Sequence, residues 1–135
     1  VDAALIYAVI EQTMRGYVEA TWGKWVPGRV REESEHDALD PRTRIVQCNG
    51  TDCGVLQVDQ RGNELWVQMC FIFPVYQGLG IGRALLREVQ DRAQREGLPV
   101  RLRVMKVNPA KAFYKQLGFC EYERCDDFVY LQWQA

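Results

Sequence analysis

Residues 77–83, QGLGIGR, carry glycine at three alternate positions, Gly78, Gly80 and Gly82, directly before a helical pattern. Glycine is used where backbone turns sharply or approaches a ligand closely. A β-rich run at 65–73 precedes this turn, so backbone N–H groups and the positive end of the following helix converge on one point, which favours a phosphate. The turn therefore predicts an anion site, with a tight strand-to-helix connection as the alternative.

Two common phosphate-binding motifs do not fit this turn. A Walker loop ends in Gly-Lys-Ser or Gly-Lys-Thr, whereas Gly82 is followed by Arg83 and Ala84, which supply no hydroxyl for magnesium. A dinucleotide fingerprint needs Gly-x-Gly-x-x-Gly, and the spacing here is Gly-x-Gly-x-Gly. Nucleoside triphosphatase and dinucleotide-dependent chemistry are both disfavoured.

Composition points to one domain over residues 1–135 without a global charge signal. The 17 Lys and Arg against 18 Asp and Glu leave a net charge of −1, so we expect neither a nucleic acid nor an anionic membrane as partner. No apolar run approaches the ~20 residues that span a bilayer, and we expect a cytoplasmic protein. The five cysteines include no Cys-x-x-Cys pair and no histidine partner nearby, so we expect no metal site.

The sequence before the glycine turn predicts helices followed by an antiparallel meander. Asp2 is positioned to cap a helix that ends near Met14, with Gly16 as its stop. Residues 17–39 hold one or two further helical stretches, irregular and aromatic-rich, with a break at Pro27-Gly28. Asn49-Gly50 joins strands 44–48 and 51–58 as a hairpin, and a turn at 59–63 leads into strand 65–73.

The sequence after the turn predicts alternating helices and strands. The expected elements are a helix over 83–96, a strand from 100 to about 107, a helix from Asn108-Pro109 to Leu117 stopped by Gly118, and strands 119–123 and 128–133. Strand 128–133 would offer an exposed edge on which a second copy could form a homodimer.

Two segments resemble the signatures of the GNAT N-acetyltransferase superfamily. Residues 77–82 are similar to its Gln/Arg-x-x-Gly-x-Gly/Ala motif, and 108–119, NPAKAFYKQLGF, to its second motif, a helix begun by Asn, bearing a Tyr and ended by Gly-Phe. The resemblance spans about 44–133. It implies the α+β acyl-CoA N-acyltransferase fold, a bent, mixed, mostly antiparallel sheet flanked by helices. The family's first strand would be missing or lie upstream of residue 1.

The resemblance also implies acetyl-CoA as co-substrate, held where the family's fourth and fifth strands splay apart. Its pyrophosphate would lie on the turn that comprises Gln77, Gly78, Leu79, Gly80, Ile81, Gly82 and Arg83. Main chain at Ile72 and Phe73 would pair with the pantetheine arm, and an amide near Ile72 would polarise the thioester carbonyl.

The reaction that the resemblance implies needs an acid and a base. Tyr114 is the candidate acid for the departing thiolate, with a core aromatic as the alternative. Asn108 either contacts cofactor or substrate or acts only as a helix cap. Many relatives carry a glutamate on the fourth strand, where this chain offers Gln68. The base stays open among an ordered water, Glu64, Glu19 and Glu121.

The acceptor would be chosen by the first two helices, which flank the cleft in this family. Trp22 and Trp25 are the candidates to line it, with plain helix packing as the alternative. The acidic run 32–37, which includes His36, either attracts a cationic amine or forms a solvated helix face. The resulting hypothesis is transfer of acetyl to a primary amine of a small molecule or peptide. The alternative is an acyl-CoA-binding sensor or regulatory module with weak catalysis.

Overall fold

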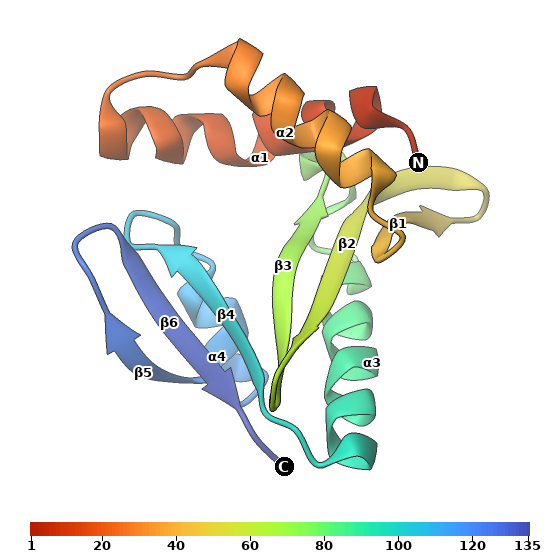
Figure 1. The fold of residues 1–135 in the computed structure, drawn as a ribbon, viewed down its shortest axis with the longest axis vertical. Helices are drawn as coiled ribbons and strands as arrows, with labels where there is room; N and C mark the ends of the chain where they lie inside the picture. Colours follow the sequence, from red (N-terminus) through yellow and green to blue (C-terminus); the bar gives the residue numbers. More distant parts are fainter. The chain divides into compact units, whose positions relative to one another are not determined.

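The computed structural model describes residues 1–135 and contains both helices and strands (Figure 1). In chain order the elements are α1 (Ala3–Trp22), α2 (Pro27–Leu39), β1 (Thr43–Cys48), β2 (Thr51–Arg61), β3 (Glu64–Ile72), η1 (Pro74–Tyr76), α3 (Ile81–Glu96), β4 (Val100–Met105), α4 (Lys111–Gln116), β5 (Cys120–Arg124) and β6 (Phe128–Trp133).

The strands form one mixed sheet in the order β1-β2-β3-β4-β6-β5. β3 and β4 are parallel, whereas β1 with β2, β4 with β6, and β5 with β6 are antiparallel. A mixed, largely antiparallel sheet with helices confirms the expected α+β class. The prediction that 128–133 is an edge strand is wrong, because β6 lies between β4 and β5. A strand pattern in the sequence does not encode lateral order, and here the final hairpin places its second strand inside.

The chain folds into two compact units. The N-terminal unit comprises residues 1–57 and 69–82, and the C-terminal unit comprises 58–68 and 83–135. β2 and β3 contribute residues to both units.

In the N-terminal unit, α1 is longer than expected. The Asp2 carboxylate caps it, with Oδ1 accepting from the Ala4 amide at 2.9 Å. Gly16 does not stop the helix, which continues to Trp22 and ends at Gly23 with φ of +83°. An interior glycine costs a helix only about 1 kcal/mol, and the fully buried Ile6 and Val9 anchor α1 in the core of this unit.

Pro27-Gly28 begins α2 rather than breaking a helix, because proline fits the first helical turn. Residues 17–39 are therefore largely helical and not irregular. The hairpin at Asn49-Gly50 is confirmed, with φ of +53° and +78°. β2 runs past the predicted 58 to Arg61, so the next turn is the tighter Gly62-Asn63.

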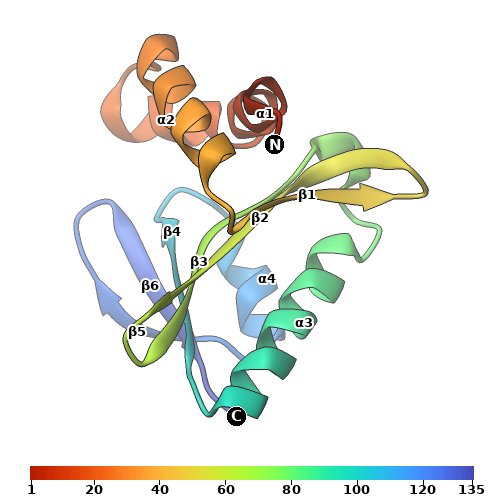
Figure 2. The same ribbon diagram turned by 45° about the vertical axis from the view of Figure 1, so that its right-hand side comes forward.

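In the C-terminal unit, α3 and α4 lie on the same side of the β4, β6 and β5 strands (Figure 2). The amide Nε2 of buried Gln90 on α3 donates to the Leu117 carbonyl at 2.9 Å. α4 begins at Lys111, later than predicted, because Pro109 and Ala110 form a turn first. β4 ends at Met105, two residues before the predicted 107.

The parallel pairing of β3 with β4 is short. It covers Leu65 with Val100 and Trp66 with Arg101, and the two strands are not paired beyond that point. In the terms of the family resemblance, β3 and β4 correspond to the fourth and fifth strands, and their pairing is limited to these two positions.

Candidate functional site

The glycine turn holds two residues in a backbone conformation that favours glycine. Gly78 and Gly80 have φ of +79° and +85°, where residues with a side chain are strained. A Cβ added at either position would meet no atom within 4 Å. The positive φ is what requires glycine here, and the space in front of the backbone is open to a ligand.

Hydrogen-bond donors are available along this turn. The Gln77 amide donates to the Pro74 carbonyl at 3.1 Å and ends the turns of η1, whereas the amides of 78–80 donate to no protein acceptor. α3 begins at Ile81, and the first amides of a helix have no intrahelical partner. Arg83 adds an exposed guanidinium in the first turn of α3. Several donors, a helix N-terminus and a cation fit a diphosphate.

The side chain of Gln77 ties the turn to the end of β3. Its Nε2 donates to the Ile72 carbonyl at 2.9 Å. The family motif places Gln77 in the predicted pyrophosphate turn, but it does not predict this contact with Ile72. A glutamine at this position with a free carbonyl five residues earlier is compatible with many loop geometries, so no sequence signal identifies the bond.

The two main-chain positions proposed for the pantetheine differ in the structure. The Phe73 amide already donates to the Cys53 carbonyl of β2 at 2.9 Å. Since neighbouring residues of a strand direct their N–H groups to opposite sides, the Ile72 amide points away from β2. Ile72 is therefore the position with an amide left for a ligand. Phe73 can contribute its ring or its carbonyl.

Tyr114 and Asn108 belong to the C-terminal unit. The half-buried Tyr114 ring packs edge-on against Phe113 and Phe119, with centroids 5.3 and 5.6 Å away. Asn108 Oδ1 accepts from the Ala110 amide at 2.9 Å and stabilises the turn that leads into α4. Asn108 thus has a local structural role whether or not it also touches a ligand.

The carboxylates considered as bases are all engaged with arginines. Glu19 lies 3.1 Å from Arg15, Glu64 lies 3.2 Å from Arg101, and Glu121 lies 2.7 Å from Arg124. The hydrogen bond from Arg124 lowers the pKa of Glu121, which makes this carboxylate a weaker base.

Gln68 is engaged as well. Its Oε1 accepts from Trp66 Nε1 at 2.9 Å and from Arg61 at 3.1 Å. Gln68 is therefore held by one neutral donor, the Trp66 indole, and one charged donor, the Arg61 guanidinium.

The two tryptophans proposed for the acceptor site differ in exposure. Trp25 Nε1 lies 3.4 Å from Tyr7 Oη, and the two rings meet edge to face at 6.3 Å. Trp25 thus packs on α1, as predicted by the alternative of plain helix packing. Trp22 is 50% exposed at the end of α1. In the acidic run of α2, Ser34 is buried and His36 is exposed.

All five cysteines are free thiols, and no cluster of three or more His, Cys, Asp or Glu side chains is arranged to hold a metal ion. None of the helices combines the length and the apolar character needed to cross a membrane.

A family model identifies the family to which this chain belongs. Residues 40–121 match the acetyltransferase (GNAT) domain, and the chain belongs to this family. It is 33% identical over 86 residues to a protein described as IAA acetyltransferase from Azospirillum brasilense, an alignment that covers 61% of this chain. The chain spans only 56% of the length of that relative.

Solved structures share the fold over nearly the whole chain. The PaiA N-acetyltransferase of Thermoplasma acidophilum, solved with coenzyme A, has a TM-score of 0.74 at 16% identity and covers 99% of this chain and 93% of its own. The ribosomal-protein-S18-alanine N-acetyltransferase of Escherichia coli has a TM-score of 0.72 at 20% identity, over 98% and 87%. At these identities the likeness shows the fold alone.

Proposed function

We propose that this chain is an acetyl-CoA-dependent N-acetyltransferase that transfers acetyl directly to a primary amine of a small molecule or peptide. The observation that carries the proposal is the glycine turn, with its positive φ angles, its open space and its unpartnered amides. Coenzyme A in a structural neighbour and the names of the relatives support the same co-substrate.

In this proposal, the turn at 77–83 donates its amides and the Arg83 guanidinium to the pyrophosphate of acetyl-CoA. Gln77 holds the turn against Ile72. The Ile72 amide, directed away from β2, donates to the pantetheine arm or to the thioester carbonyl. When bound, acetyl-CoA supplies an activated acetyl group for attack by the amine.

Two proton transfers have to accompany the reaction. A lysine-like amine with a pKa near 10.4 needs about 4.6 kcal/mol to lose its proton at pH 7, so deprotonation limits the reactive fraction. The departing thiolate has an ordinary pKa near 8.5 and takes a proton from a nearby hydroxyl. We assign that hydroxyl to Tyr114, whose ring is fixed by Phe113 and Phe119.

A thiol-release assay with acetyl-CoA tests the proposal. Lysine peptides, polyamines, aminoglycosides and amino acids serve as acceptors. Tyr114→Phe should lower kcat about 100-fold or more, as expected for a lost general acid, and should leave the Kd for coenzyme A within about twofold. Tyr17→Phe on α1 is the control and should leave both values unchanged. An unchanged kcat in Tyr114→Phe would remove Tyr114 from the chemistry.

A second candidate is a sensor or regulatory module that binds acyl-CoA without efficient catalysis. It is favoured by Gln68, which takes the place of the glutamate of many relatives and is bonded to Trp66 and Arg61. Calorimetry separates the two candidates. Tight coenzyme A binding without amine-dependent thiol release would favour the module.

A further inference from the structure

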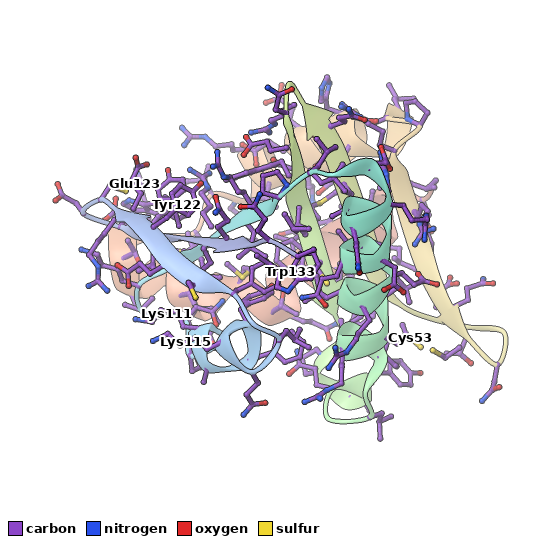
Figure 3. All side chains as sticks on the ribbon, turned by 90° about the horizontal axis from the view of Figure 1, so that it is seen from below. Cys53, Lys111, Lys115, Tyr122, Glu123 and Trp133 are labelled. Atoms are coloured by element: carbon purple, nitrogen blue, oxygen red, sulfur yellow. The ribbon has the colours of Figure 1, made fainter.

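One face of the sheet in the C-terminal unit carries arginines and aromatic rings. Along β4 and β6, one set of alternate residues is buried, namely Val100, Leu102, Val104, Val129 and Leu131. The opposite face, here called the arginine-aromatic face, comprises Trp66, Arg101, Arg103, Tyr122, Phe128 and Tyr130. Figure 3 shows Tyr122 on one side of the β5–β6 hairpin and Lys111 and Lys115 of α4 on the other.

Three rings of this face, those of Trp66, Tyr130 and Tyr122, form a connected row. Tyr130 meets Trp66 and Tyr122 with centroid distances of 6.4 and 6.2 Å. The Arg101 guanidinium lies over the Tyr122 ring at 5.0 Å, and that of Arg103 lies over Phe128 at 4.0 Å. Stacking on a ring fixes a guanidinium and leaves its N–H donors free for a planar anion.

The two arginines differ in what else they bind. Arg101 is ion-paired with Glu64 at 3.2 Å and donates to Gln132 at 2.7 Å. Arg103 is exposed, and no carboxylate of the chain pairs with it. Glu123 faces the same way on β5 but is separated from Arg103 by β6. Two strand spacings are about 10 Å, so Glu123 leaves the Arg103 donors unoccupied.

Arg103 also stands at the gap where β3 and β4 part. The last paired residues are Trp66 and Arg101, and Arg103 follows Arg101 by two residues on the same face. Two residues of strand span about 7 Å, so Arg103 lies at the margin of the gap. Across the gap, Gln68 holds the corresponding place after Trp66, with its carbonyl engaged by Trp66 and Arg61. At the margin of this gap, the Arg103 guanidinium is therefore available to a ligand, and no carboxylate is.

We propose that Arg103 recognises a carboxylate of the acceptor, so that the substrate class is a small amine that also carries a carboxylate. The proposal rests on the acetyltransferase function proposed above. An arginine fork binds a carboxylate through two parallel hydrogen bonds. Polyamines and aminoglycosides, which are cationic throughout, are disfavoured by the same charge.

Matched acceptors test this inference. Glycine, L-phenylalanine and L-glutamate are each compared with the corresponding α-amide, and kcat/KM is measured for the unaltered protein, Arg103→Gln and Arg103→Lys. An acid and its amide differ in the pKa of the amine, but this difference affects the acid-to-amide ratio of kcat/KM equally for every protein variant. The acid-to-amide ratio of kcat/KM, compared between proteins, therefore isolates Arg103.

We expect the ratio to fall at least tenfold in Arg103→Gln, with Arg103→Lys between the two and the Kd for coenzyme A unchanged. Arg87→Gln, an exposed arginine of α3, is the control and should leave the ratio unchanged. NMR titration of the coenzyme A complex with the same acids supplies a readout without turnover. Chemical-shift changes that are weakened in Arg103→Gln support the inference.

The outcomes separate the inference from the proposed function. Acetylation of amines with a ratio indifferent to Arg103 overturns the inference alone. No acetylation of any amine overturns the proposed function. In that case the NMR titration still decides, because an absence of acid binding, or binding that does not depend on Arg103, overturns the inference as well.

Discussion

Replacing Gly80 by alanine separates the cost of the turn to stability from its value for binding. Gly80 has φ of +85°, and a left-handed conformation costs a residue with a side chain about 1–2 kcal/mol. An added Cβ would meet no atom within 4 Å, so no collision within the protein increases this cost. We expect the free energy of unfolding of Gly80→Ala to fall by about 1–2 kcal/mol.

The effect on coenzyme A should be larger than this loss of stability suggests. The new methyl group would occupy the open space in front of the amides, where the proposal places the diphosphate. A lost hydrogen bond to a charged group costs about 1.5–3 kcal/mol. This corresponds to a Kd about 10- to 150-fold higher. Isothermal titration calorimetry well below the melting temperature measures this Kd, and urea unfolding measures the stability.

Gly50→Ala is the matched control for Gly80→Ala. Gly50 has φ of +78°, and its added Cβ would likewise meet no atom within 4 Å, but it lies in the β1–β2 hairpin. It should lose the same stability and keep the Kd for coenzyme A within about twofold. An unimpaired Kd in Gly80→Ala, or an equal loss of affinity in both variants, would refute the assignment of the turn to the diphosphate.

Three further predictions concern stability. Gly54→Ala should lower the free energy of unfolding by about 3 kcal/mol, because its Cβ would collide with the Phe71 carbonyl oxygen. Gly16→Ala in α1 has open space around its added Cβ and should raise the free energy of unfolding by up to about 1 kcal/mol. Urea unfolding checks both, and the opposite order would contradict the packing described. Gln90→Leu should cost about 1–3 kcal/mol in the same assay because it leaves the Leu117 carbonyl without its donor, and an unchanged midpoint would show that water replaces the bond. The hydrogen bond from Arg42 holds the pKa of Asp40 at about 2, below its ordinary 3.8, so this carboxylate stabilises the fold above pH 3.8 and the contribution is lost as the pH falls through about 2. The melting temperature of Asp40→Asn should therefore fall less between pH 5 and pH 2 than that of the unaltered protein. Parallel melting curves of the two proteins over this pH range would contradict the prediction.

The elements most accurately predicted are those whose signals are local. Asn49-Gly50 determined its hairpin through its own φ angles, and the Asp2 cap followed from a side chain two residues from its partner. The ends of helices were less predictable. Gly16 and Gly23 are equivalent as sequence signals, yet the helix passes the first and ends at the second.

The features that the sequence could not reveal depend on register and strand order. The sequence predicted a strand from 100 to about 107, in which Arg101 and Arg103 alternate with apolar residues. That Arg103 would stack on Phe128 and that Tyr130 would lie between Trp66 and Tyr122 depends on β6 pairing with β4. Because strand order cannot be read from the sequence, 128–133 was wrongly predicted to be an edge strand. For the candidate site, the two motifs predicted the turn and Tyr114, but not the bond from Gln77 to Ile72.

The ion pairs of this chain bear on how an acceptor amine would lose its proton. Glu19, Glu64 and Glu121 are each paired with an arginine, and the hydrogen bond from Arg124 lowers the pKa of Glu121. A positive charge near a cationic amine acts in the opposite sense to a base, because like charges favour the neutral form of the amine. Arg103, without a carboxylate partner, is such a charge. An acceptor whose carboxylate is bound by Arg103 would have its amine close to the same cation. Recognition of the acid and loss of the amine's proton would then depend on one residue, and Gln68 would not need to be a base.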